Sequence, residues 1–253
     1  MLWRLALVFA LVGSPLCAEE QVVLGLSSDR VAITATFEGS DILIFGAVKR
    51  EAAIPETPLD VVITVAGPSL PVTVRRKSRE FGIWINTDMV DLDSAPSFYA
   101  VATTGPLDAV LSDTEDLRHR VSIPRAIRSV GAASMVEDSG AFIDALIRIK
   151  RDQDAYQMRE GAVAIDQQTL FRTAISMPAN LTEGTYETRI FLARDGQVVS
   201  QYQTEIDVRK VGLERFLFTM SREQPMLYGL MSLAIAIAAG WGASAIFQVL
   251  RRG

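Results

Sequence analysis

The densest group of side chains that could do chemistry is a basic cluster at residues 75–79. Arg75, Arg76, Lys77 and Arg79 lie within five residues, and Phe81 follows them closely. Guanidinium groups offer paired N–H donors that suit oxyanions. A free anion, a lipid head group or an acidic partner surface could therefore dock there. The alternative, which the residue pattern favours, is a charged hairpin tip or edge strand that discourages pairing with other strands.

The remaining polar residues do not form a recognisable catalytic or metal-binding set. His119 is the one histidine of the chain, and a single histidine without other good ligands does not make a zinc site. Asp88, Asp91 and Asp93 have a spacing that could hold Ca²⁺, but the EF-hand pattern is missing, so a solvated acidic loop is the favoured interpretation. The sequence also lacks the common hydrolase, nucleotide-binding and zinc-protease motifs. We therefore predict no catalytic residue, no metal site, no cofactor and no enzymatic activity.

Charge and cysteine content narrow the class of protein further. The formal net charge is −5, which argues against general nucleic-acid binding because that function requires a basic face. The one cysteine, Cys17, lies close to the N-terminus, so the rest of the chain has no disulfide framework. The body of the protein must be stabilised by an ordinary hydrophobic core.

An uncharged, mostly apolar run at residues 226–250 predicts a transmembrane helix. As an α-helix its 25 residues span about 37 Å, enough to cross a hydrocarbon core of about 30 Å with some tilt. Arg251 and Arg252 follow it at once, as the positive-inside bias prefers for a cytoplasmic tail of residues 251–253. The lipid bilayer is therefore a predicted partner.

Small residues near the end of this helix could mediate contact with another helix. Gly240, Ala243 and Ser244 have the four-residue spacing that lets two helices approach closely. The alternative is the ordinary enrichment of glycine and alanine in membrane-spanning helices. The sequence leaves both interpretations open.

The N-terminus predicts export. Residues 1–18 combine Arg4, a short apolar stretch and a small residue, Ala18, at the cleavage position of a signal peptide. A first membrane helix is the alternative, although eight apolar residues are too few to span. A lipoprotein signal at Cys17 is disfavoured because no small residue comes just before it. Export followed by a stop-transfer helix places the ectodomain outside the cytoplasm.

The ectodomain predicts a mainly β fold. Short β-branched or aromatic runs separated by turn residues fill residues 19–130 and favour an antiparallel β-sandwich of immunoglobulin type. Residues 131–210 predict one inserted amphipathic helix, with Phe142, Ala145, Leu146 and Ile149 on one stripe, and an antiparallel hairpin through an Asp-Gly turn. Residues 211–225 form an amphipathic juxtamembrane segment that either lies in the membrane interface or packs on the ectodomain.

Five short motifs occur together in this order: FGIWIN, SGAFIDALIRIK, LFR, EGTY and YGL…GW. With them the chain resembles the alpha-proteobacterial putative transmembrane protein family, uncharacterised single-span envelope proteins, over nearly its whole length. The resemblance implies a Gram-negative inner membrane, a periplasmic ectodomain and a cytoplasmic C-terminus. Members are often encoded beside TauE/SafE-type sulfite exporter permeases, which implies an accessory role in moving sulfur-containing anions. No catalytic residue is implied.

We therefore expect a non-enzymatic accessory subunit of a membrane transporter. The predicted helix–helix contact at Gly240, Ala243 and Ser244 would supply part of its interface. The alternative is a periplasmic sensor module that binds an anion or another ligand through Arg75, Arg76, Lys77 and Arg79.

Overall fold

The computed structural model describes residues 20–28, 30–34, 37–50, 54–129, 138–210, 217 and 220–252. The predicted signal peptide, residues 1–18, and most of the predicted juxtamembrane segment, residues 211–225, lie outside the described residues. The chain divides into two units, one of residues 1–29 with 39–207 and one of residues 30–38 with 208–253.

A four-stranded antiparallel sheet contains β1 (Gln21–Leu26), β3 (Ser40–Lys49), β10 (Leu170–Met177) and β9 (Ala164–Asp166), in that spatial order. β10 alternates strictly between exposed and buried side chains, because successive residues of a strand point to opposite faces. Phe171, Ile175 and Met177 supply its buried side. The opposite side of this sheet carries the exposed apolar residues Val23, Leu43, Phe45 and Leu170.

A six-stranded sheet has the order β2 (Arg30–Ile33), β12 (Gln197–Lys210), β11 (Gly184–Arg194), β4 (Asp60–Ala66), β7 (Tyr99–Thr103) and β8 (Tyr156–Arg159). β2 and the last residues of β12 belong to the second unit. β4 and β7 are buried along almost their whole length, which explains their nearly continuous apolar sequences. Both sheets contain strands from the two predicted β regions, residues 19–130 and 131–210.

The predicted hairpin between β11 and β12 is confirmed. Its turn consists of Asp195 and Gly196, with φ angles of 49° and 75°. Two consecutive positive φ angles define the turn that matches the twist of a hairpin, and Asp-Gly is among the sequences that adopt it most readily.

One strand pair departs from the predicted antiparallel arrangement, since β7 and β8 are parallel. A parallel pair needs a long crossover. This crossover holds α1 (Leu107–Val110), α2 (Asp113–His119), α3 (Ile123–Ala126) and α5 (Ser139–Asp152). The expectation that strands fill residues 19–130 is therefore wrong for residues 107–126. α2 begins at Ser112, whose hydroxyl accepts a hydrogen bond from the Glu115 amide at 3.4 Å.

The predicted amphipathic helix is confirmed as α5, but its buried stripe differs from the predicted one. Phe142, Leu146 and Ile147 are buried, whereas Ile149 is 47 % exposed. These residues join a core with side chains from β4, β7 and β11, from α3, and from the base of the β5–β6 hairpin described next. The helices of the crossover and the hairpin base therefore cover one face of the six-stranded sheet.

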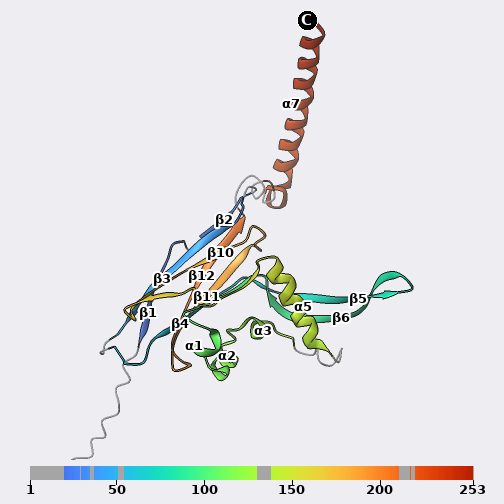
Figure 1. The fold of residues 1–253 in the computed structure, drawn as a ribbon. Helices are drawn as coiled ribbons and strands as arrows, with labels where there is room; N and C mark the ends of the chain where they lie inside the picture. Colours follow the sequence, from blue (N-terminus) through green and yellow to red (C-terminus); the bar gives the residue numbers. More distant parts are fainter. Residues whose placement is uncertain are drawn as a thin grey trace, which may run out of the picture. The chain divides into compact units, whose positions relative to one another are not determined.

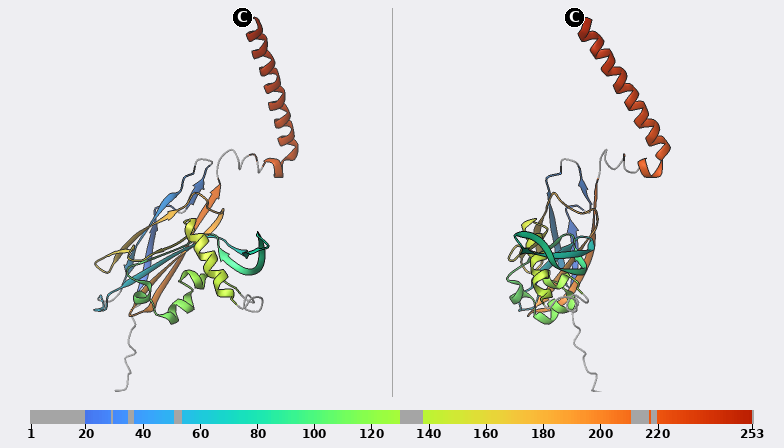
Figure 2. Two further views of the ribbon diagram at one scale, coloured as in Figure 1. Left: turned by 45° about the vertical axis from the view of Figure 1, so that its right-hand side comes forward. Right: turned by 90° about the vertical axis from the view of Figure 1, so that its right-hand side faces the viewer.

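A long hairpin of β5 (Ser69–Glu80) and β6 (Ile83–Pro96) forms a two-stranded sheet of its own. It leaves the six-stranded sheet where β4 and β7 meet, since Ala66 and Tyr99 are direct register partners. Figures 1 and 2 show it running beside α5 and curling at its far end. The sequence predicts short separate strands in this region, whereas these two strands have 12 and 14 residues and form one hairpin.

The second unit contains α7 (Pro225–Arg252). Residues 225–244 have a mean hydropathy of 1.6 and none of the span is buried. Among the described residues, α7 is the one helix long and apolar enough to cross a membrane. The predictions of a mainly β fold and of one C-terminal apolar helix are confirmed, while the immunoglobulin-like sandwich stays a prediction.

Candidate functional site

The turn of the β5–β6 hairpin has an unusual sequence for its geometry. Phe81 and Gly82 are its two central residues, with φ angles of 51° and 87°. Asparagine, aspartate or glycine normally occupies the first position, because a side chain in the left-handed region approaches the neighbouring carbonyl. A bulky aromatic residue there is a genuine outlier. The backbone of Phe81 is therefore strained, and its phenyl ring lies at the tip of the hairpin.

Large apolar side chains surround this turn and face solvent. The exposed fraction is 104 % for Phe81, 65 % for Ile83 and 67 % for Trp84. Ile85 and Met89 are exposed as well. Scattered exposed apolar residues are common on proteins, but a contiguous group at a projecting tip indicates a binding surface.

The basic cluster predicted from the sequence lies on β5 directly before this tip, and strand alternation divides it. Arg75, Lys77 and Arg79 share one face, opposite Met89, Asn86 and Trp84 in the register. The extra residue at the register shift after Arg76 lies on β6, so β5 keeps its regular alternation. All three basic residues are exposed, and none forms an ion pair with a residue that the structure describes.

Arg76 points to the other face and has a structural role. Its Nη1 lies 4.0 Å from Asp88 Oδ2, and its Nη2 lies 3.5 Å from Asp138 Oδ2. The guanidinium carbon lies 4.6 Å from the centre of the Phe142 ring, close enough for a cation–π contact. Arg76 therefore ties the hairpin to α5, and the candidate site keeps only Arg75, Lys77 and Arg79 from the predicted four.

The predicted acidic loop is a strand. Asp88, Asp91 and Asp93 all lie in β6. Asp88 pairs with Arg76, and Asp91 accepts a hydrogen bond from the Thr73 hydroxyl at 2.5 Å. Within the described ranges, no three histidine, cysteine or acidic side chains are grouped as a metal site requires.

His119 belongs to a packed network around α2. Its Nε2 lies 3.4 Å from Glu115 Oε2 and its ring centre lies 5.2 Å from that of Phe191. Arg189 donates to the His119 carbonyl at 2.7 Å and to the Tyr99 hydroxyl at 3.3 Å. Burial raises the pKa of Tyr99 to about 12, so the phenol stays protonated and donates to the Val121 carbonyl at 2.8 Å. These contacts fasten the helical crossover to the sheet.

Asp116 closes the loop that follows α2, a role the sequence analysis missed. Its carboxylate accepts hydrogen bonds from the backbone amides of Val121 at 3.0 Å and Ser122 at 2.7 Å. It also pairs with Arg125 Nε at 2.8 Å. These three contacts hold the loop between α2 and α3 in place.

Glu20 joins two arginines from distant parts of the chain. Its Oε1 lies 2.6 Å from Arg50 Nε and 2.9 Å from Arg194 Nη2. The three side chains are only 8–10 % exposed. Burial raises the pKa of Glu20, but hydrogen bonds and the charges of Arg194 and Arg50 outweigh burial, and the pKa is lowered from its ordinary value of 4.5. The cluster links the start of β1 to the ends of β3 and β11.

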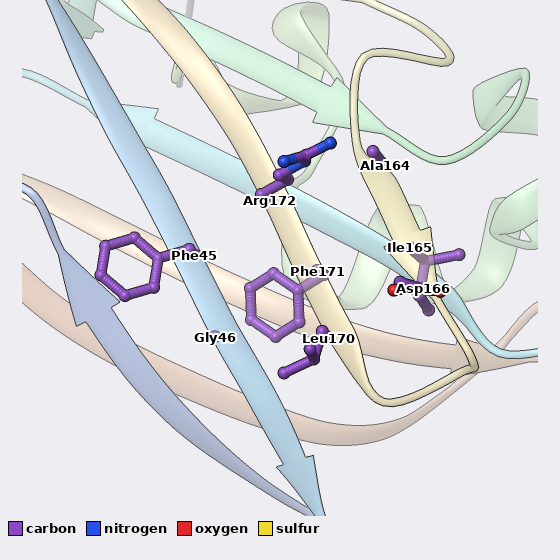
Figure 3. A pocket seen from close by; sticks show the side chains of 8 residues that line it. All are labelled: Phe45, Gly46, Ala164, Ile165, Asp166, Leu170, Phe171 and Arg172. Atoms are coloured by element: carbon purple, nitrogen blue, oxygen red, sulfur yellow. The ribbon is translucent and has the colours of Figure 1, made fainter.

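A hollow of about 450 Å³ lies on the four-stranded sheet and is mainly apolar. Figure 3 shows the rings of Phe45 and Phe171 on neighbouring strands, with Arg172 to one side and Asp166 beyond them. Gly25 makes room for Phe45, since a Cβ there would lie 2.4 Å from the ring. No sequence motif pointed to this hollow, because its lining comes from three strands. It offers apolar contact and one guanidinium, and its lining includes no acid–base pair suited to catalysis.

The exposed helix α7 carries a stripe of small residues. They occupy every fourth position and are Ser232, Ala236, Gly240 and Ser244. Ala243 borders this stripe, so the three predicted contact residues share one side of the helix. A Cβ added at Gly240 would meet nothing within 4 Å, so its surface is uncovered within the described chain. Such a stripe allows close approach of a second helix.

A family model matches nearly the whole chain. Residues 21–249 match the family model described as Putative transmembrane protein (Alph_Pro_TM). No curated protein matches the chain. The matched range includes both sheets, the β5–β6 hairpin and nearly all of α7.

Proposed function

The chain belongs to the Alph_Pro_TM family of putative transmembrane proteins, and from that premise we propose that it is a non-enzymatic accessory subunit of a membrane transporter. One helix, α7, anchors a mainly β ectodomain, and the same helix contacts a multi-span partner within the bilayer. In this proposal the ectodomain is periplasmic, the anchor lies in the inner membrane and the C-terminus is cytoplasmic.

The observation that carries the proposal is the uncovered small-residue side of α7. Apolar surface gives no hydrophobic driving force for association between helices inside a bilayer, so close packing at small residues becomes important. Gly240, Ala243 and Ser244 form such a surface, and none of the span is buried by the rest of the chain. A single anchoring helix needs no such surface if lipid alone surrounds it.

The candidate partner is a permease of the TauE/SafE type, which the family resemblance implies, and the cargo would be a sulfur-containing anion. The lack of a catalytic arrangement around His119 or in the hollow near Phe45 is consistent with a role in assembly or gating. Support for this partner comes from the resemblance alone, so the experiment must identify the partner without presuming it.

Crosslinking in intact membranes followed by mass spectrometry tests the proposal. The double variant Gly240→Leu with Ala243→Leu places two bulky side chains on the small-residue side. The comparison variant, Gly242→Leu with Ala238→Leu, makes the same two changes in a second row of small residues on the opposite side of the helix, so the pair of variants shows which row the partner contacts. We expect the first variant to lose the crosslinked membrane protein and the comparison variant to keep it. Equal recovery by both variants, or recovery of the chain by itself from wild-type membranes, would refute the proposal.

A second candidate function is capture of a free anion by the hairpin. It is favoured by the position of Arg75, Lys77 and Arg79 on one exposed face without a carboxylate partner among the described residues. Calorimetry of the full-length protein in nanodiscs with sulfite, thiosulfate and taurine tests it. Heat that disappears in a variant with all three residues changed to glutamine would support anion capture, and no heat with any of the three ligands would exclude it.

A further inference from the structure

We propose that the tip of the β5–β6 hairpin inserts into the interface of an anionic lipid bilayer, with Phe81 and Ile83 at the edge of the acyl chains and with Trp84, its register partner Arg79 and Lys77 at the level of the head groups. The inference goes beyond the proposed function and does not depend on it, because the ligand is the lipid surface and not the transporter. A lipid surface would contact both the basic face of β5 and the apolar tip, whereas a free anion would contact only the basic face.

The tip has the composition of an interfacial anchor. Trp84 is 67 % exposed, and tryptophan prefers the boundary between hydrocarbon and water because its ring is apolar with one polar N–H. Phe81 projects fully and Ile83 is 65 % exposed, which adds apolar area at the end of the hairpin. Burial of such side chains in the bilayer interface is favourable in proportion to the apolar area removed from water.

The basic residues lie at the depth of the head groups when the tip enters the acyl region. A strand advances about 3.4 Å per residue, so along the strand Arg79 is roughly 7 Å and Lys77 roughly 14 Å behind Phe81, and the curl at the far end of the hairpin makes the straight-line distances shorter. The head-group layer of one leaflet is about 5–8 Å thick. Arg79 then lies within this layer, Lys77 at its outer edge, and Arg75 about 20 Å from the tip, within reach of the negative surface potential.

The charges around the tip are complementary to an anionic surface. Arg75, Lys77 and Arg79 have no ion-pair partner in the described part of the chain, whereas Arg76 is paired with Asp88 and Asp138. The nearest carboxylate to the turn is Glu80, which lies on the other face and accepts a hydrogen bond from the Ser78 hydroxyl at 3.3 Å. Asp91 also lies on the basic face, opposite Thr73, but Arg75, Lys77 and Arg79 are all nearer the turn, so the charge next to the tip on this face is positive.

The strained turn points to the same conclusion. Asparagine at position 81 would satisfy the left-handed backbone with little strain, yet this position carries phenylalanine at a φ of 51°. Strain at an exposed residue suggests that the side chain serves a function outside the folded chain. A protein partner could also cover an aromatic tip, but it would not require unpaired cations at head-group depth behind that tip.

Depth measurements on the full-length protein in nanodiscs test the proposal. In a Cys17→Ser background, Ile83→Cys provides a single cysteine for an environment-sensitive fluorophore, and Leu117→Cys on exposed α2 provides the control position. The discs contain phosphatidylcholine with about 30 % phosphatidylglycerol. We expect spin-labelled lipid to quench the residue 83 fluorophore at least about twofold more than the residue 117 fluorophore, and aqueous iodide to show the reverse order.

Two variants separate the apolar and electrostatic contributions. Phe81→Asn should reduce quenching by lipid to the level of the control position while leaving the turn intact. Lys77→Gln with Arg79→Gln should lower the ratio of inserted to free tip about fivefold per charge, as expected for about 1 kcal/mol per basic residue near an anionic surface. Arg148→Gln with Arg151→Gln, two exposed arginines of α5, is the matched charge control and should change nothing.

Three results would overturn the proposal. One is a residue 83 fluorophore that iodide quenches as strongly as the residue 117 fluorophore. Another is lipid quenching that does not respond to phosphatidylglycerol or to loss of Lys77 and Arg79. The third is a tip that is protected in native membranes but open to water in nanodiscs, which would assign the tip to a protein partner.

Discussion

Replacing Glu20 with glutamine should destabilise the first unit, because among the described residues Glu20 is the carboxylate that pairs with both Arg50 and Arg194. All three side chains are 8–10 % exposed, so the two guanidinium groups cannot turn to bulk water without a local rearrangement. Glutamine keeps the shape of the side chain and one acceptor oxygen, but it removes the negative charge and replaces the other acceptor by a donor. The variant therefore leaves two buried positive charges close together.

The size of the effect follows from the geometry. Glu20 accepts from Arg50 Nε at 2.6 Å and from Arg194 Nη2 at 2.9 Å. Charge-assisted hydrogen bonds contribute about 1.5–3 kcal/mol each, and removal of one partner from a buried ion pair costs about 3–5 kcal/mol. We expect a loss of about 3 kcal/mol, because glutamine can still accept one bond. For a unit of this size that loss lowers the melting temperature by about 6–12 °C.

The effect should also depend on pH. The pKa of Glu20 in the folded chain lies below its ordinary value of 4.5, so as the pH falls the unfolded chain takes up this proton before the folded chain does. The stabilisation is therefore complete above pH 4.5 and is lost as the pH falls through the folded pKa. The difference between wild type and Glu20→Gln should be largest near neutral pH and should shrink below pH 4.5.

Thermal unfolding of the full-length protein, followed by near-ultraviolet circular dichroism in nanodiscs at several pH values, measures both effects. Glu205→Gln, an exposed carboxylate on β12, serves as the matched control and should leave the melting temperature unchanged. If Glu20→Gln melted within about 2 °C of the wild type at pH 7, which is less than about 1 kcal/mol for a unit of this size, the cluster would not stabilise the fold as we argue.

Two further changes have defined outcomes. Phe81→Asn should raise the free energy of unfolding by about 1 kcal/mol, because asparagine tolerates the left-handed backbone better than phenylalanine does. Urea unfolding measures this change. A destabilised variant would show that the ring packs against the folded chain. Asp116→Ala should lower the free energy of unfolding by about 3 kcal/mol, because it leaves the amides of Val121 and Ser122 and the guanidinium of Arg125 without their acceptor. Urea unfolding measures this loss as well. A loss under about 1 kcal/mol would contradict the hydrogen bonds to the Asp116 carboxylate described above.

Elements with strong local signals could be predicted from the sequence. α7 follows from an uninterrupted apolar run, and the β11–β12 hairpin follows from Asp195 and Gly196 between two alternating strands. α5 follows from helical spacing of apolar residues, although Ile149 turned out to be exposed. The helices at residues 107–126 were missed even though Ser112 and Glu115 have the spacing of a helix cap, because each helix is too short to show a period.

The candidate site depended on features that do not lie next to each other in the sequence. The four basic residues are nearly contiguous, but only the strand register separates Arg76 from the other three. The β5–β6 hairpin was not recognised as one unit because Phe81 stands where asparagine or aspartate normally marks such a turn. The parallel pairing of β7 and β8 likewise could not be predicted, because it joins segments on either side of a long crossover in which the structure describes α1, α2, α3 and α5.

The β5–β6 hairpin lies between β4 and β7, at a position where a tight turn would be enough to connect these two strands. Ala66 and Tyr99 are paired partners, and the Gly67 amide donates to the Phe98 carbonyl at 2.8 Å just beyond them. These contacts hold the two ends of the hairpin together, whatever the number of residues between them. Each pair of residues added to or removed from both arms beyond the buried base would change its reach by about 7 Å without disturbing a ladder in either sheet. Relatives of this protein could therefore differ in the length of the β5–β6 hairpin while keeping the same two larger sheets.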